Sequence, residues 1–538
     1  MSQNVATDRF AQPAGLLPML MFGVVMLAGI GYSGQQMAVD LSAATSMEAL
    51  PYIVLGVALL IALGFEFVNG FHDTANAVAT VIYTNSLTPS VAVVWSGLCN
   101  LAGVLTSSGA VAFGILSLLP VELILQVGSQ AGMAMVFALL IAAILWNLGT
   151  WYLGLPASSS HTLIGSIIGV GLMNQFMAPA GSATSGVDWS QAAKVGYSLL
   201  LSPLVGFAAS ALLLFVARKL LASKGHLFEA PEGNKAPPLL IRGLLILTCS
   251  GVSFAHGSND GQKGMGLIML ILIGSVPTAY ALNRAVEPSY VQTFTQASTQ
   301  AMSVLDRLAD QGVTIVSSEE ARSTVTAFLR DHKADARTIP ALRRLGSDIV
   351  ANVTQYPSLA QVPSSQMPNI RNDIYLESDA LRLLSKSGSV FAAADDQKAV
   401  ETYRKSLDHA TRFIPPWVKV AVALALGLGT MVGWKRIVVT VGEKIGKDHL
   451  TYGQGAAAEI TAMATIGAAD HYGLPVSTTH VLSSGVAGTM WANKSGLQWS
   501  TIRNLAMAWL LTLPASIGLA ALLFWTFNSW IGKMSAVS

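Results

Sequence analysis

Two polar sequence motifs occur twice each, and all four copies interrupt strongly apolar segments. Residues 69–73 read Asn-Gly-Phe-His-Asp, and residues 256–260 echo them as His-Gly-Ser-Asn-Asp. Residues 154–161, Gly-Leu-Pro-Ala-Ser-Ser-Ser-His, return at 473–480 as Gly-Leu-Pro-Val-Ser-Thr-Thr-His. An aspartate inside a bilayer costs ~3 kcal/mol on insertion scales, so such residues mark a pathway or a binding site. Interrupted apolar segments at matching places in two halves indicate a membrane transporter with its site between repeats.

Charge is distributed unevenly along the 538 residues. Hydrophobic residues make up 52% of the chain and charged residues 11%, which is typical of a polytopic membrane protein rather than a soluble enzyme. Half of the charged residues, 15 basic and 15 acidic, lie between Arg284 and Arg412, so this stretch is predicted to be a soluble domain. The net charge of +2 provides no basic face, and no nucleic-acid partner is expected.

The spacing of the motifs predicts where this domain was inserted. His161 follows Asp73 by 88 residues, whereas His480 follows Asp260 by 220, and the difference of 132 nearly equals the length of the charged stretch. The second half is therefore predicted to be the first half with a helical insert after its first motif. The predicted domains are an N-terminal extra transmembrane helix with its loop (1–50), a first transmembrane repeat (51–217), a cytoplasmic connector (218–242), a second transmembrane repeat (243–283 and 414–530) and a soluble helical insert (284–413).

Lys and Arg residues predict the orientation of the repeats. They concentrate in the short connectors 218–242 and 434–450, which are therefore expected in the cytoplasm. Threading the apolar spans between them places the insert in the periplasm and the two repeats in opposite orientations. The predicted fold class is an all-α polytopic membrane protein with two inverted-topology repeats, broken helices and hairpins. The apolar run 51–84 would be ~50 Å long as one helix, against a ~30 Å hydrocarbon core. Breaks are therefore predicted at Asn69-Gly70 and at His256-Gly257.

The first motif pair supplies ligands for a small cation. Asp73 and Asp260 would follow the predicted breaks, where an aspartate can also cap a new helix. Carboxylate and amide oxygens at an unwound segment suit a hard cation, and a carboxylate repels phosphate unless a proton or metal ion lies between them. Glu459, in an apolar run, either carries a proton or forms an interhelical hydrogen bond. The predicted coupling-ion or proton ligands, with any transported metal ion at the two aspartates, are Asp73, Asp260, Asn69, His256 and Glu459.

The second motif pair suits an anion. Hydroxyl groups and backbone N–H groups at a helix N-terminus form an anion cradle, although plain N-capping is the structural alternative. His161 and His480 either pack in the core, donate to the anion or carry a proton. Lys263 could attract the anion, extend its ammonium group to the membrane surface or pair with a carboxylate. The predicted substrate-binding residues are Ser158, Ser159, Ser160, His161, Thr162, Ser477, Thr478, Thr479, His480, Asn76 and Asn259.

These motifs resemble those of the PiT inorganic phosphate transporters. The two aspartate motifs resemble the family's twin signatures, and the two Gly-Leu-Pro elements look like its substrate-binding hairpins. The Gly-Gln-Lys-Gly run after Asp260 and the place of the insert are similar to the bacterial low-affinity Pit type. The resemblance implies symport of inorganic phosphate across the bacterial inner membrane by alternating access, coupled to H⁺ or alternatively Na⁺. It further implies free phosphate or a complex with Mg²⁺ or another divalent metal as substrate, no cofactor, a lipid-embedded chain and, as one assembly, a homodimer.

Two other functions remain open at this point. The nearer one is a permease for sulfate or another tetrahedral oxyanion, which a competition assay separates because phosphate changes its protonation near neutral pH. The more distant one is an intramembrane serine hydrolase. Ser160 and His161 are adjacent on one predicted helix and therefore point in different directions, so they do not form a nucleophile–base pair by themselves. We expect a transporter and not an enzyme.

Overall fold

The computed structural model describes residues 16–42, 49–73, 75–119, 121–178, 186–221, 223, 225–233, 235–287, 289–310, 312–388 and 390–535. Within these ranges the chain is helical, and β-type pairing is confined to one bridge between Gly446 and Leu497. The helices that precede the insert are α2 (Leu16–Ser42), α3 (Ala49–Asp73), α4 (Ala75–Tyr83), α5 (Pro89–Thr106), α6 (Ala110–Leu116), α7 (Val121–Leu125), α8 (Gln130–Tyr152), α9 (Ser159–Met177), α10 (Trp189–Leu220), α11 (Leu239–Ser275) and α12 (Pro277–Tyr280).

The remaining helices form the insert and the end of the second half. They are α13 (Tyr290–Leu308), α14 (Ser318–Asp331), α15 (Thr338–Thr354), α16 (Met367–Ser387), α17 (Ala394–Thr411), α18 (Pro416–Met431), α19 (Lys435–Val439), α20 (Tyr452–His471), α21 (Thr478–Ala492) and α22 (Trp499–Ser535). Six helices of the described chain, or seven if the sharply bent pair α17–α18 is one span, are long and apolar enough to cross a membrane. The predicted all-α multi-pass class is confirmed, and the inversion of the repeats stays a prediction.

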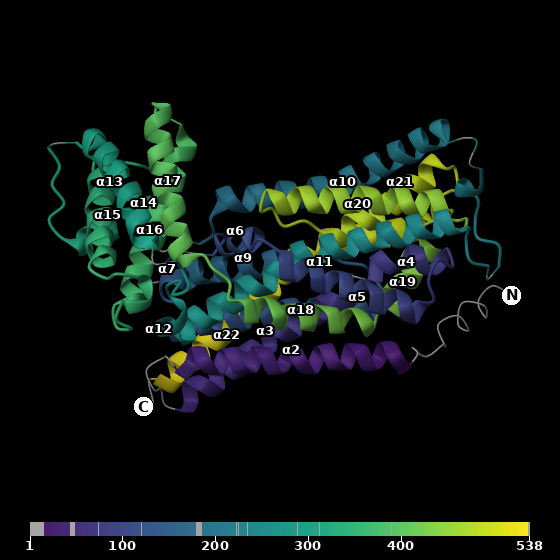
Figure 1. The fold of residues 1–538 in the computed structure, drawn as a ribbon, viewed down its shortest axis with the longest axis horizontal. Coiled ribbons are helices and arrows are strands. Elements are labelled where there is room, and N and C mark those ends of the chain that lie inside the picture. Colours follow the sequence, from purple (N-terminus) through teal and green to yellow (C-terminus); the bar gives the residue numbers. More distant parts are fainter. Residues whose placement is uncertain are drawn as a thin grey trace.

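Helices α13 to α17 gather at one end of the molecule, whereas the long apolar helices run side by side along its length (Figure 1). The five helices enclose a core of their own, in which Phe294, Leu342 and Tyr403 are fully buried. The two ends of the insert meet where the backbone N–H of Asn283 donates to the carbonyl oxygen of Ala410 at 2.7 Å. The insert also contacts the first half of the chain away from this point, because Arg371 of α16 donates to the carbonyl oxygen of Ile124 in α7 at 3.3 Å.

The predicted helix breaks at Asn69-Gly70 and His256-Gly257 are wrong. Helix α3 continues through Gly70 to Asp73, and α11 is helical throughout its 37 residues. One glycine costs a helix only ~1 kcal/mol relative to alanine, so it does not force a break. Both glycines instead allow close packing: a Cβ atom at Gly70 would clash with the carbonyl oxygen of Leu426 in α18, and one at Gly257 with that of Asn100 in α5.

The two halves of the chain interleave through matched contacts. Gly429 of α18 abuts the carbonyl oxygen of Phe67 in α3, and Gly103 of α5 abuts that of Phe254 in α11. Phe67 and Phe254 occupy the same position relative to Asp73 and Asp260. In the same crosswise manner α9 packs on α22, and α21 on α10. Because each half packs on the other, all four motifs reach the centre of the membrane part.

Gly70→Ala is expected to destabilise the protein by ~1–3 kcal/mol, the usual cost of overpacking, because the new methyl group meets rigid backbone of α18. Gly64→Ala in the same helix is the matched control, since nothing lies within 4 Å of a Cβ atom there. Thermal unfolding in detergent measures both. Equal unfolding temperatures for the two variants would contradict the close packing of α3 on α18.

Candidate functional site

Two helical hairpins of the same design carry the second motif pair. Helices α8 and α9 are joined by residues 153–158, and α20 and α21 by residues 472–477. Each first helix ends at a glycine with positive φ, 66° at Gly154 and 65° at Gly473, a conformation that glycine adopts without steric cost. The proline two residues later leads the chain into the next helix. The Gly-Leu-Pro sequence thus reverses the chain in the same way in both halves.

The first hydroxyl of each hairpin tip caps a helix. The Oγ atom of Ser158 accepts the backbone N–H of His161 at 3.2 Å, and that of Ser477 accepts the backbone N–H of His480 at 3.1 Å. These two serines therefore act as N-caps, which was the alternative to anion binding. The N–H groups of the first residues of α9 and α21 have no acceptor within their own helix and remain suited to an anion.

The tips of the two hairpins meet inside the protein. Ser160 donates its hydroxyl to the carbonyl oxygen of Val476 at 2.6 Å. Asn259 of α11 donates to the carbonyl oxygen of Leu474 at 3.1 Å and so braces the second tip. Pro156 and Pro475 are buried. Irregular backbone at this depth is tolerated in a membrane protein only where protein or a water-filled cavity surrounds it.

Asp73 and Asp260 face each other across this junction. Asp73 is the last residue of α3, and Asp260 lies in the middle of α11, so neither begins a half-helix as the predicted breaks required. Thr479 donates to Oδ1 of Asp73 at 2.6 Å, and Ser159 donates to its Oδ2. The same Ser159 hydroxyl lies 3.4 Å from Oδ2 of Asp260. Hydroxyls one or two residues after the caps therefore contact both carboxylates.

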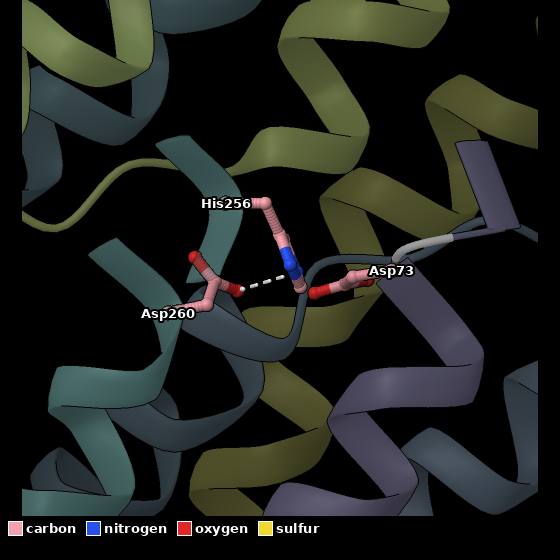
Figure 2. Close-up of side chains that lie close together, drawn as sticks. All are labelled: Asp73, His256 and Asp260. Atoms are coloured by element: carbon pink, nitrogen blue, oxygen red, sulfur yellow. Dashed lines mark ion pairs between the residues drawn. The ribbon is translucent and has the colours of Figure 1, made fainter. Parts of the chain in front are cut away.

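His256 lies between the two aspartates (Figure 2). Its Nε2 atom is 3.5 Å from Oδ2 of Asp260, and one ligand atom from each of Asp73, His256 and Asp260 lies within 4.8 Å of the others. Two carboxylates and an imidazole at this spacing can hold a small cation. The predicted neighbourhood of Asp73, Asp260 and His256 is thus present as one buried cluster.

Lys263 also belongs to this cluster, and of the roles that the sequence left open for it, pairing with a carboxylate is the one observed. Its ammonium Nζ lies 2.7 Å from Oδ1 of Asp260 and 2.5 Å from the hydroxyl oxygen of Ser160. The ion pair joins a lysine to an aspartate one helical turn earlier, the spacing at which side chains of one helix meet. The contact of Lys263 with Ser160 depends on the packing of the two halves against each other and cannot be predicted from the local sequence.

The rings of the two motif histidines pack against each other at a tilt. The ring centroids of His161 and His480 are 4.6 Å apart, and the ring of Trp509 in α22 lies 4.3 Å from that of His480 on a centroid-to-centroid measure. Among the described residues, Nδ1 of His161 and Nε2 of His480 have no hydrogen-bond partner. The two rings therefore pack together, with His480 buried and His161 half-buried, and retain two nitrogen atoms for a ligand or a proton.

Other predicted residues lie outside the cluster. Asn69 contacts Glu66 at 3.5 Å, and Thr162 donates to Asn147 at 3.0 Å. Glu459 accepts hydroxyl hydrogen bonds from two threonines, which matches the interhelical alternative given for it. These threonines are Thr80 of α4 and Thr248 of α11. The side chain of Asn76 lies outside the described residues.

The whole cluster is closed to solvent. Asp73 is 2% exposed, and Asp260, Lys263 and Ser159 are 0% exposed. A buried carboxylate is stable only with charged or hydrogen-bonding partners, which the lysine and the hairpin hydroxyls supply. A solute can reach these groups only after the hairpins or the motif helices move.

Comparisons with known proteins identify the family of the chain. The sequence profile described as Phosphate transporter family matches residues 69–520. The chain is 44% identical to "Low-affinity inorganic phosphate transporter PitA" of Escherichia coli (strain K12) over 493 residues, which cover 87% of this chain and 96% of that protein. It is 27% identical to a "Probable low-affinity inorganic phosphate transporter" of Bacillus subtilis (strain 168), covering 88% and 98%.

A solved structure described as "The sodium-dependent phosphate transporter" is 18% identical, with a TM-score of 0.47, and covers 88% of this chain and 99% of that one. The profile and the bacterial relatives confirm the resemblance seen in the motifs: this chain belongs to the phosphate transporter family.

Proposed function

We propose that the protein is a low-affinity symporter that imports inorganic phosphate across the bacterial inner membrane together with a cation. The observation that carries the proposal is the meeting of two hydroxyl-rich hairpin tips with a buried pair of aspartates. The E. coli and Bacillus relatives are named as inorganic phosphate transporters, which favours phosphate over sulfate and a transporter over a hydrolase.

Chemistry divides the site into two parts. The N-termini of α9 and α21 offer N–H groups and positive dipole ends to the phosphate. Asp73, Asp260 and His256 would hold the positive charge that accompanies it, because a bare carboxylate repels phosphate. Anion and cation would thus neutralise each other in the buried site.

The membrane potential requires such coupling. Moving one negative charge inward against 100 mV costs ~2.3 kcal/mol, so a phosphate dianion faces roughly 4.6 kcal/mol. Two accompanying monovalent cations offset that cost. A neutral complex of phosphate with a divalent metal avoids it, and one added proton then makes uptake electrically favourable. Because the cluster is closed to solvent, it would load and release by alternating access between the two repeats.

Uptake of radiolabelled phosphate into proteoliposomes tests the function. Proton, sodium and magnesium gradients are imposed one at a time, and sulfate is added as a competitor. We expect phosphate accumulation with a proton gradient and no competition from equimolar sulfate. Lack of phosphate uptake under every gradient, or equal competition by sulfate, would contradict the proposal.

A further inference from the structure

The two aspartate motifs differ in charge at one matched position. Asn76 follows Asp73 by three residues, and Lys263 follows Asp260 by three. The aspartates themselves are matched, because the glycine three residues before each packs on a helix of the other half. The first motif thus carries a neutral amide where the second carries an ammonium group.

The ammonium of Lys263 lies among ligands that a small cation would use. It contacts a carboxylate oxygen, Oδ1 of Asp260, at 2.7 Å and the hydroxyl of Ser160 at 2.5 Å. The hydroxyl of Thr478 is 3.4 Å from the same carboxylate oxygen. Carboxylate and hydroxyl oxygens converging from a helix and two hairpin tips form the usual environment of a coupling cation in a transporter. A lysine ammonium carries the same charge as Na⁺ or H₃O⁺ on a flexible stem.

We propose that the ammonium of Lys263 permanently occupies a cation site at Asp260, which matches a cation site at Asp73. Two matched aspartates could bind two cations from solution, so each transport cycle would use one mobile cation fewer. The inference rests on the proposed function, since it concerns the coupling ratio of that transport. Its physical basis is the cost of a buried carboxylate without a counter-charge, which would otherwise recruit a cation from solution.

The positive charge of Lys263 should also attract the anion. Lys263 contacts Ser160, whose hydroxyl lies at the tip of the first hairpin, where the N-terminus of α9 begins. The ammonium therefore adds positive charge beside the proposed phosphate position and remains there throughout the cycle. A mobile cation at Asp73 would contribute its gradient to the driving force, whereas the charge of Lys263 would not.

Lys263→Asn gives the second motif the residue of the first and provides the test. The full-length protein is reconstituted in proteoliposomes at zero membrane potential, with a tenfold inward gradient of the cation that drives the wild type. Each coupled cation multiplies the equilibrium phosphate accumulation by roughly ten, since a tenfold gradient supplies one factor of ten. We expect the variant to accumulate roughly tenfold more phosphate than the wild type at equilibrium, although more slowly. An active variant with the wild-type ratio would overturn the proposal.

A charge-preserving variant and an unfolding measurement complete the test. Lys263→Arg keeps the charge and should keep the wild-type ratio. If Lys263→Asn does not transport, the unfolding temperature of the purified full-length protein is measured against the driving cation. We expect a larger cation-dependent rise than in the wild type, and an equal rise would overturn the proposal. Failure of the wild type to take up phosphate would instead count against the proposed function.

Discussion

Asp260→Asn is expected to abolish phosphate uptake and to destabilise the protein, and a second substitution, Lys263→Met, should restore only the stability. Asp260 and Lys263 are fully buried and their charged atoms are 2.7 Å apart. Removing one partner of a buried ion pair typically costs ~3–5 kcal/mol because the other charge is left without compensation. Replacing both partners by uncharged groups of similar size is often close to neutral.

Uptake should follow a different pattern from stability. The single and the double variant both lack a carboxylate that faces the cation cluster, so neither should accumulate phosphate in proteoliposomes above empty vesicles. Thermal unfolding in detergent measures the stability of each variant, and the amount of reconstituted protein normalises the uptake. Wild-type uptake by the inserted double variant would contradict a role of Asp260 in coupling.

An exposed ion pair in the insert provides the control. Asp306 pairs with Arg343, and the two side chains are 50% and 56% exposed. Such surface pairs contribute ~0–1 kcal/mol, so Asp306→Asn should change neither uptake nor the unfolding temperature measurably. A loss of uptake in this variant would indicate that charge substitutions in this chain impair transport without touching the cluster.

The repeated motifs predict which polar side chains lie close together, although not what they bind. Asp73, Asp260 and His256 were expected together and lie in one cluster with hydroxyls of both hairpins. Composition alone also separated the charged insert from the apolar helices. These features are local in sequence or follow from counting, and no knowledge of distant contacts is needed for them.

The predicted helix breaks are wrong because the structural role of a glycine depends on contacts with residues distant in sequence. A glycine inside an apolar run is compatible with a broken helix or with a close helix crossing. Gly70 and Gly257 lie at close helix crossings because they pack on the backbone of Leu426 and Asn100, respectively, and both of these residues are far away in sequence. The contact of Lys263 with Ser160 likewise exists only because the halves interleave.

The roles of three consecutive serines likewise cannot be told apart from the sequence. By composition Ser158, Ser159 and Ser160 are equivalent candidates for an anion site. Their roles differ because the first is the N-cap of α9, so that each following residue points in a different direction around the helix axis. One serine caps the backbone, one contacts the aspartates, and one contacts the other hairpin and Lys263.

This division of roles leads to the second large expected effect. Ser159→Ala should reduce the initial rate of phosphate uptake at low phosphate by roughly ten- to a hundredfold, because a hydrogen bond to a charged group contributes ~1.5–3 kcal/mol. The lost hydroxyl is the one that lies between Asp73 and Asp260. Its unfolding temperature should fall as well, because the lost bond to a buried carboxylate also stabilises the fold, although the remaining donor Thr479 still holds Asp73.

Ser158→Ala is the matched variant one residue earlier and should lower the unfolding temperature while leaving the rate of uptake close to that of the wild type. Loss of the N-cap costs ~1 kcal/mol of stability, while the hydroxyls that contact the carboxylates stay in place. The second hairpin repeats the comparison with Thr479→Val, which removes a contact to Asp73, and Ser477→Ala, which removes a cap. Initial uptake rates and unfolding temperatures are measured for all four variants. The contradicting result would be a loss of uptake in the cap variants as large as in Ser159→Ala and Thr479→Val, at unchanged stability. The capping hydroxyls would then have to contact the phosphate themselves. The anion would in that case lie deeper between the hairpin tips than the N-termini of α9 and α21 indicate.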